Sequence, residues 1–129
     1  MHKGFLKTAA VLGALAVILG AFGAHGLKKL VGPDVVSTYE TGVRYQFYHV
    51  FLLLAIAMLF EKFPGKLLTN AAFCCIIGIV LFSGSLYLMA AFNAANMVGI
   101  SGLGIVTPIG GVFFILSWLM VLAAVLKKN

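Results

Sequence analysis

YETGVRYQFYHVFLLLAIAMLF, residues 39–60, joins a polar first half to an uninterrupted apolar second half. The apolar part covers only residues 50–60, whereas a helix needs about 20 residues to cross a hydrocarbon core of about 30 Å. If this segment spans a membrane, its polar half must enter the membrane as well. Polar groups at that depth are costly and face other helices. The segment therefore predicts a bundle of several spanning helices with polar contacts inside it.

The composition of the whole chain also favours a membrane location. Of the 129 residues, 63% are hydrophobic and 9% are charged, and the mean hydropathy is +1.14. A soluble domain carries about 25% charged residues, so this chain has too little polar surface to cover a globule in water. The net charge of +6 comes mostly from lysines at the ends of apolar runs. That grouping indicates contacts with lipid headgroups and argues against nucleic-acid binding.

Four windows are apolar and long enough to span: residues 5–24, 44–60, 67–91 and 106–126. We therefore expect an all-α integral membrane protein, a four-transmembrane-helix bundle forming a single transmembrane domain over residues 1–129. Between the first two windows, Pro33 and Asp34 are typical of a helix start, and the following valines are spaced for one apolar face. This predicts a short interfacial helix leading into the second span. The other expected connections are EKFPGK (61–66) and NAANMVGISGLG (93–104).

The basic residues predict the orientation of the bundle. With four spans, both termini and the 61–66 turn share one side of the membrane. That side carries six of the nine basic residues: Lys3, Lys7, Lys62, Lys66, Lys127 and Lys128. The other side carries Lys28, Lys29 and Arg44. Because basic residues favour the cytoplasmic side, we expect a multi-pass protein with both termini cytoplasmic.

The polar side chains of several spans are expected to gather in the outer half of the bundle. At 1.5 Å per residue, one outer cluster should contain His25, Glu40, Arg44, Tyr45, His49, Ser83, Ser85 and Tyr87, and we predict that it binds a ligand. Glu40 and Arg44 are four residues apart, in the order that favours an ion pair. Plainer interpretations stay open, because tyrosines also form interfacial belts and Arg44 could snorkel or simply pair with Glu40.

Small residues repeat along the first span at Ala9, Gly13, Ala16, Gly20 and Ala24. Such a stripe allows close approach of helices in a membrane. It offers a surface for a homo-oligomer, which we expect for a bundle of this size. Cys74 and Cys75 are adjacent, so a disulfide between them would be strained, and we interpret them as packing residues.

Three strings occur in order along the chain: GAFGAHGL (20–27), YQFYH (45–49) and FSGSLY (82–87), followed by TPIGG (107–111). In combination they resemble the family of small bacterial inner-membrane proteins of unknown function, which has mitochondrial transmembrane relatives in animals. The resemblance runs over essentially the whole chain and implies four helices in the bacterial inner membrane. It implies no catalytic residue, substrate or cofactor.

Several functions remain open at this point. The first is non-enzymatic binding of a small or lipid-like ligand, or a structural or partner role, through the outer polar cluster. The second is a small oligomeric transporter or channel, with a helix broken at the glycines and proline of residues 99–111. The third is a haem-, metal- or quinone-binding protein that uses His25 and His49. Ser83 or Ser85 near His49 would lack an acid to orient the histidine, so we expect no enzyme, and we expect no cofactor or metal.

Overall fold

The computed structural model describes residues 1–96 and 102–127, and this part of the chain is helical with connecting turns. Four helical stretches are long and apolar enough to cross a membrane. They are α1 (Lys3–His25) with the short 3-10 helix η1 (Leu27–Lys29), α2 (Pro33–Leu59), the third span, and α5 (Leu103–Leu126). The third span joins α3 (Lys66–Gly78), the π-helical segment η2 (Ile79–Ser83) and α4 (Gly84–Ala94). The four-span, all-α prediction is confirmed.

The predicted interfacial helix does not form a separate element. The helix begins at Pro33 as expected, but it continues without a break to Leu59 as α2. The physical reason is the phase of its buried face: Tyr39 and Val43 lie on the same face as Val50 further along the helix. Because the buried residues of the first half of α2 lie on the same side of the helix as those of its second half, α2 can bury both sets without bending. The 3-10 helix η1 and the turn after it make the connection from α1 instead. The expected connection 93–104 lies partly outside the described residues.

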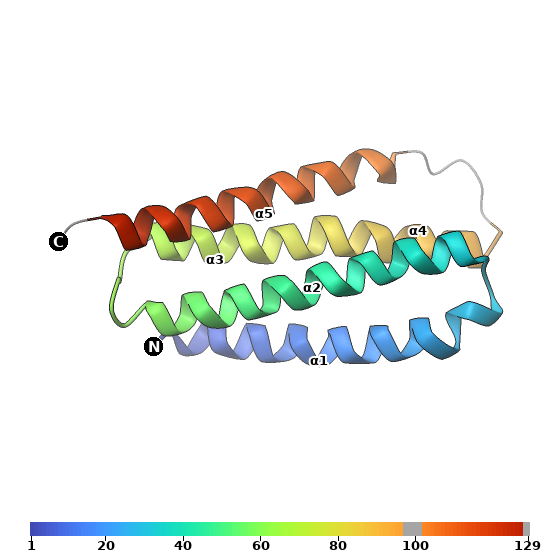
Figure 1. Cartoon of the computed structure of the whole chain (residues 1–129), viewed down its shortest axis with the longest axis horizontal. Coiled ribbons are helices and arrows are strands. Elements are labelled where there is room, and N and C mark those ends of the chain that lie inside the picture. Colours follow the sequence, from blue (N-terminus) through green and yellow to red (C-terminus); the bar gives the residue numbers. More distant parts are fainter. Residues whose placement is uncertain (97–101, 128–129) are drawn as a thin grey trace.

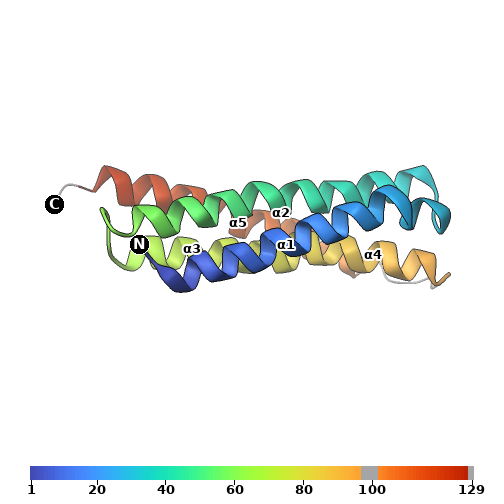
Figure 2. The same cartoon turned by 90° about the horizontal axis from the view of Figure 1, so that it is seen from below.

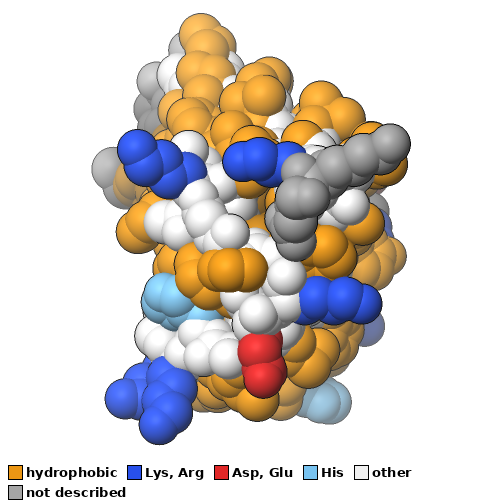
Figure 3. Space-filling model, turned by 90° about the vertical axis from the view of Figure 1, so that its left-hand side faces the viewer, with side chains coloured by type: hydrophobic (Ala, Val, Ile, Leu, Met, Phe, Trp, Pro, Cys, Tyr) orange, Lys and Arg blue, Asp and Glu red, His pale blue; other side chains and the backbone are white. Residues whose placement is uncertain are grey.

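Both termini lie at one end of the bundle, where the turn at residues 60–65 also lies (Figure 1). Figure 3 looks onto this end and shows lysine side chains around its rim. The exposed lysines at this end are Lys3, Lys7, Lys62, Lys66 and Lys127, whereas Lys128 lies outside the described residues. The structure therefore agrees with the predicted grouping of basic residues at one end. Which side of the membrane this end faces remains a prediction.

α2 and the third span form the centre of the bundle. In Figure 1 the spans follow one another in the order α5, third span, α2, α1, and in Figure 2, seen from the side of α1, α5 lies behind the others. In the most apolar 18-residue window of each span, 50% of the α2 residues are buried, against 17% for α1 and 22% for α5. α1 and α5 are therefore flanking helices that turn most of their surface away from the bundle.

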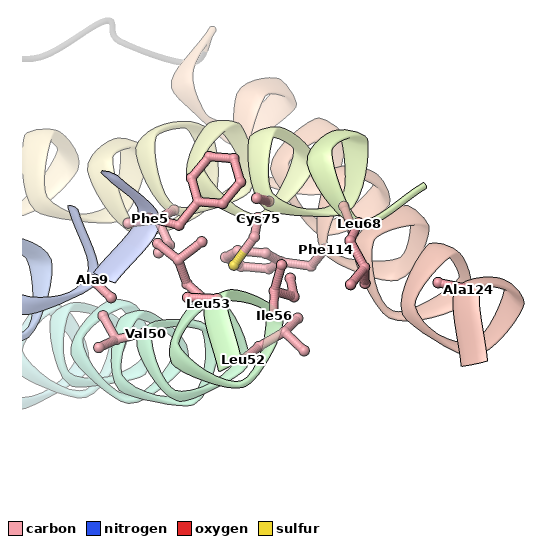
Figure 4. Packing of buried hydrophobic residues seen from close by; sticks show 14 residues of the cluster. Phe5, Ala9, Val50, Leu52, Leu53, Ile56, Leu68, Cys75, Phe114 and Ala124 are labelled. Carbon is pink, nitrogen blue, oxygen red and sulfur yellow. The ribbon is translucent and has the colours of Figure 1, made fainter. Parts of the chain in front are cut away.

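The half of the bundle near the termini has an apolar core (Figure 4). Phe5 of α1, Leu53 and Ile56 of α2, Leu68 of α3 and Phe114 of α5 are all buried in one cluster. Lipid tails are as apolar as these side chains, so close van der Waals packing rather than exclusion of water stabilises such a core. Most side-chain hydrogen bonds between the spans lie in the other half of the bundle, as the sequence predicted.

Glycines in two of the four strings, GAFGAHGL and TPIGG, allow neighbouring helices to approach closely. A Cβ atom added to Gly23 would lie 2.6 Å from the Tyr39 ring, and one added to Gly110 would overlap the backbone of Phe82. Gly23 therefore seats Tyr39 of α2 against α1, and Gly110 brings α5 onto η2. These glycines of GAFGAHGL and TPIGG position helices rather than ligands.

The small-residue stripe of α1 packs inside the protomer. Ala9 and Ala16 are fully buried, and Cβ atoms added to Gly13 and Gly20 would touch Val50 and Val43 of α2. Ala9, Gly13, Ala16 and Gly20 of the stripe therefore pack within the protomer, whereas Ala24 is exposed. Self-association, which was expected to use this stripe, would need another surface.

Candidate functional site

Gln46 joins three helices near the middle of the bundle. Its side chain is 2% exposed. Its Nε2 atom donates to the Leu12 carbonyl of α1 over 2.7 Å, and its Oε1 atom accepts from the Tyr87 hydroxyl of α4 over 2.6 Å. An unpaired amide in an apolar interior costs about 1–3 kcal/mol. Both ends of this amide are paired, so Gln46 fixes the relative position of α1, α2 and α4.

Tyr39 lies beside this bridge. Its hydroxyl donates to the Leu19 carbonyl of α1 over 2.5 Å. Its ring centroid is 5.2 Å from that of Tyr87, a separation within the range of favourable aromatic pairs. The two tyrosines thus form a continuous aromatic surface between α1 and α4.

His49 is held by both ring nitrogens. Its Nδ1 atom lies 2.8 Å from the Tyr45 carbonyl and its Nε2 atom 3.1 Å from Nε1 of Trp118. A carbonyl only accepts and an indole N–H only donates, so Nδ1 carries the proton and Nε2 is the acceptor. The neutral ring stacks on Phe114 with 3.5 Å between centroids. His49 therefore has no free nitrogen for a metal, a haem iron or a proton transfer.

The two serines of FSGSLY also make bonds between helices. Ser83 Oγ donates to the Gly42 carbonyl of α2 over 2.6 Å. Ser85 Oγ lies 2.5 Å from Thr107 Oγ1 of α5 and also donates to the Phe82 carbonyl over 2.8 Å. Neither serine is bonded to His49. Their contacts attach the third span to its neighbours on both sides.

His25, Glu40 and Arg44 do not join these groups. His25 is exposed at the last residue of α1. Arg44 is exposed and donates to Thr41 Oγ1 over 3.0 Å. The predicted Glu40–Arg44 ion pair is wrong, because the one ion pair within residues 1–96 and 102–127 joins the Met1 amino group to Glu61. The Arg44 side chain turns toward Thr41, three residues earlier on α2, and hydrogen-bonds there.

The predicted cluster is therefore divided into separate groups. Tyr87 meets Tyr39 and Gln46, and Tyr45 meets His49 with 6.3 Å between ring centroids. His25 and His49 are not neighbours. Tyr39 packs on Gly23, close to His25, and His49 lies ten residues further along α2, about 15 Å at 1.5 Å per residue.

Every buried polar side chain in the described part of the chain has a partner. No buried side-chain nitrogen or oxygen in this part lacks a hydrogen bond, and no group of three or more potential metal ligands occurs within it. The bundle interior as described thus offers no unpaired group to a ligand. The hollows lined by described residues open onto the surface.

A groove of about 480 Å³ lies on one such surface, between α1 and α4 with α2 beneath it. Its floor is the aromatic pair of Tyr39 and Tyr87, and its walls are apolar. The walls comprise Leu19 and Phe22 of α1, Leu27 and Leu30 at the α1–α2 connection, and Leu88, Ala90, Ala91 and Ala94 on the α4 side. Both floor hydroxyls already have partners, so the groove presents rings and aliphatic groups. Exposed Lys28 and Lys29 follow Leu27 in η1, at the same end of the bundle as His25.

The sequence interpretation missed Gln46 and the hydrogen-bonding role of Trp118. Gln46 lies three residues after Val43 and four before Val50, and both valines are buried. That spacing on the buried face of α2 is the signal that could have identified it. Trp118 is 51% exposed, and its indole N–H donates to His49.

Comparison with known proteins finds relatives along the whole chain. Residues 19–111 match a family described as "Protein of unknown function (DUF423)". A UPF0382 membrane protein of Bacillus subtilis is 43% identical over 126 residues, which cover 97% of this chain and 98% of that protein. A UPF0382 inner membrane protein of Escherichia coli is 34% identical over 119 residues, covering 92% of this chain and 86% of that protein. No solved structure matches the chain. The matched segment 19–111 contains all four strings discussed above.

Proposed function

Because this chain belongs to the DUF423 family of proteins of unknown function, whose relatives are bacterial membrane proteins, we propose a function from its geometry: it binds a lipid-like ligand in the groove between α1 and α4. The observation that carries this proposal is the groove itself. Its volume of about 480 Å³ falls in the range of roughly 300–1,000 Å³ that is usual for ligand sites. The two floor hydroxyls donate to the Leu19 carbonyl and to Gln46, so the aromatic floor is held in place and its rings can contact an apolar chain.

The lining and its surroundings favour an anionic lipid. Leucine, alanine and aromatic groups suit an acyl chain, which lies along the groove from the hydrocarbon side. Lys28 and Lys29 follow the lining residue Leu27 in the same short helix, and Lys28 lines the hollow that also holds Glu40. Each basic residue near a membrane surface contributes about 1 kcal/mol toward an anionic headgroup. Of the eight residues in the predicted ligand cluster, this proposal assigns Tyr87 to the floor and His25 to the headgroup end.

Filling the groove tests the proposal. Ala91→Phe adds a ring at an exposed position that lines the groove, and Ala14→Phe adds the same ring at an exposed position of α1 outside it. After purification in mild detergent with phosphatidylglycerol added, native mass spectrometry should find lipid retained by the wild type and by Ala14→Phe, and lost from Ala91→Phe. Circular dichroism checks that each variant keeps its helices. Equal retention by Ala91→Phe and Ala14→Phe would contradict the proposal.

Removing the rim charges tests the choice of headgroup. Lys28→Gln together with Lys29→Gln should reduce the preference for phosphatidylglycerol over phosphatidylcholine while leaving total lipid retention similar. If the wild type retains both lipids equally, the groove has no headgroup preference and the anionic assignment fails.

We also infer a non-enzymatic role with the termini in the cytoplasm. The serine hydroxyls bond to backbone carbonyls and Thr107 rather than to His49, which supports the first point. A histidine-ligated haem or metal gains no support, since His49 has both nitrogens occupied and lies far from His25. Within residues 103–111, α5 runs through Pro108 as a helix, so the broken helix expected of a transporter lacks support there.

Reporter fusions at the C-terminus test the cytoplasmic orientation. A fluorescent-protein fusion that fluoresces, together with an alkaline phosphatase fusion that is inactive, would bear out the orientation; the reverse would refute it.

A further inference from the structure

The exposed side of α2 next to α5 carries polar and aromatic side chains, of which Tyr45 also stacks on Phe82 of the third span. Tyr48 is 52% exposed and Tyr45 38% exposed, and Arg44 is exposed beside them. On α5, Trp118 continues this surface, because it contacts His49, one residue after Tyr48. We call the surface made by Arg44, Tyr45, Tyr48 and Trp118 the α2–α5 face. It is distinct from the groove, which lies between α1 and α4.

Contacts with α1 give the depth of this face. A Cβ on Gly20 would touch Val43, and one on Gly13 would touch Val50. Tyr48 therefore lies level with α1 residues between Gly13 and Gly20, near the middle of a helix that runs from Lys3 to His25. Arg44 adjoins Val43 and so lies about 7.5 Å below the end of α1 at 1.5 Å per residue. Both side chains leave the bundle at hydrocarbon depth.

Lipid chains cannot satisfy these groups. Among residues 1–96 and 102–127, the structure gives the Tyr48 hydroxyl no hydrogen-bond partner, and it gives Arg44 one bond to Thr41 and no carboxylate. Polar and charged groups at this depth are costly when they face hydrocarbon, and in membrane proteins they pair with other protein groups. The α2–α5 face therefore has the properties of a surface that another protein covers.

We propose that a second copy of this chain docks on the α2–α5 face to form a two-fold symmetric dimer. The argument for a second copy is charge complementarity. Glu40 and Arg44 lie one turn apart on α2 but are not paired with each other. Two copies inserted in the same orientation, related by a two-fold axis along the membrane normal, place identical residues at equal depth. Glu40 of the other copy then lies about 6 Å from Arg44 along the axis, and the Arg44 side chain already turns in that direction, toward Thr41, so each Arg44 can reach the Glu40 of the other copy. Such an interface is self-complementary.

The neighbouring groups fit this arrangement. Lys28 lines the same hollow as Glu40 within one protomer but does not pair with it, so the Glu40 carboxylate is open to the Arg44 of the other copy. Tyr48 is placed near the axis, where it meets its counterpart, and aromatic residues are enriched at protein interfaces. The small-residue stripe of α1 takes no part, because it packs on α2 within the protomer.

Crosslinking in native membranes tests the position of the interface. Tyr48→Cys in a Cys74→Ala background leaves only the new thiol and the buried Cys75. We expect a disulfide-linked dimer on mild oxidation. Ile18→Cys in the same background is the matched control, because Ile18 is 62% exposed on α1 but lies off the proposed interface. Equal crosslinking of the two variants, or none for Tyr48→Cys, would overturn the proposal.

Charge reversal tests the pairing itself. Arg44→Glu alone should lower the dimer fraction on the order of tenfold or more, since it places like charges together. The double variant Glu40→Arg with Arg44→Glu should restore the homodimer but should not pair with the wild type. If Arg44 instead binds a lipid phosphate, the double variant will not recover the dimer, and that result would refute the interface.

Discussion

Replacing Gln46 with methionine should measurably loosen the packing of α1, α2 and α4. Methionine has a similar length and no amide, so it keeps the volume while removing both hydrogen bonds, to Leu12 and to Tyr87. Hydrogen bonds between membrane helices contribute about 0.6 kcal/mol on average and up to about 1.7 kcal/mol. Two of them give an expected loss of about 1–3 kcal/mol in the free energy of unfolding. The Leu12 carbonyl already accepts within α1, so the unpaired Tyr87 hydroxyl should account for much of this loss.

Unfolding in mixed micelles with increasing sodium dodecyl sulfate, followed by circular dichroism, measures the change. Tyr87→Phe removes one of the two bonds and should lower stability by about 0.6–1.7 kcal/mol. The double variant should show coupling of similar size, because both changes break the same contact. Tyr45→Phe is the matched control, since it removes a tyrosine hydroxyl outside this network. A Gln46→Met variant as stable as the wild type, or additive effects of the two changes, would refute the reasoning.

Three further predictions concern packing in the bundle. Gly23→Ala should destabilise the protein by about 1–3 kcal/mol, because the new methyl group overlaps the Tyr39 ring; unchanged thermal unfolding would contradict this. Trp118→Phe should cost about 1–3 kcal/mol by leaving Nε2 of His49 unpaired, and His49→Leu should shift the emission of this single tryptophan; an identical spectrum would argue against the indole–imidazole bond. Cys75, which is fully buried, should react with a maleimide only as the bundle unfolds, and rapid labelling of the folded protein would contradict its placement.

The sequence was sufficient for the number and type of helices because these depend on composition and length. Largely apolar windows of at least 17 residues separated by polar or glycine-rich segments leave few alternatives to spanning helices. Pro33 marked the beginning of α2 for a local reason, its fixed backbone angle and missing N–H group. The continuity of α2 was harder to predict, because it depends on the match of two buried faces along one helix rather than on a local signal.

The partners of the polar side chains could not be read from the sequence in the same way. Depth counting grouped Tyr87 and His49 in one cluster, but it carries no information on helix rotation. Rotation decides that Tyr87 points to Gln46 and that His49 points to Trp118 on another helix. Spacing along one helix was misleading for Glu40, where the geometry permits an ion pair but does not require it.

Family membership was predictable from the combination of strings, and the structure explains their residues physically. In YQFYH, the glutamine and the histidine bond to other helices. In FSGSLY, both serines and the tyrosine do so. These residues are therefore understood as the contacts that set the bundle geometry, on which the proposed groove and the proposed dimer face both depend.

The bridge at Gln46 has a consequence for synthesis of the chain. The first two spans leave the ribosome before α4, and Tyr87 follows Gln46 by 41 residues. The α1–α2 hairpin can already close the bond from Gln46 to Leu12, but the Oε1 atom then stays without its tyrosine partner inside the bilayer. An incomplete protein thus carries an unmet acceptor at membrane depth. Insertion of the third span removes it, so a chain stalled after α2 should be recognisable to the machinery that degrades unassembled membrane proteins.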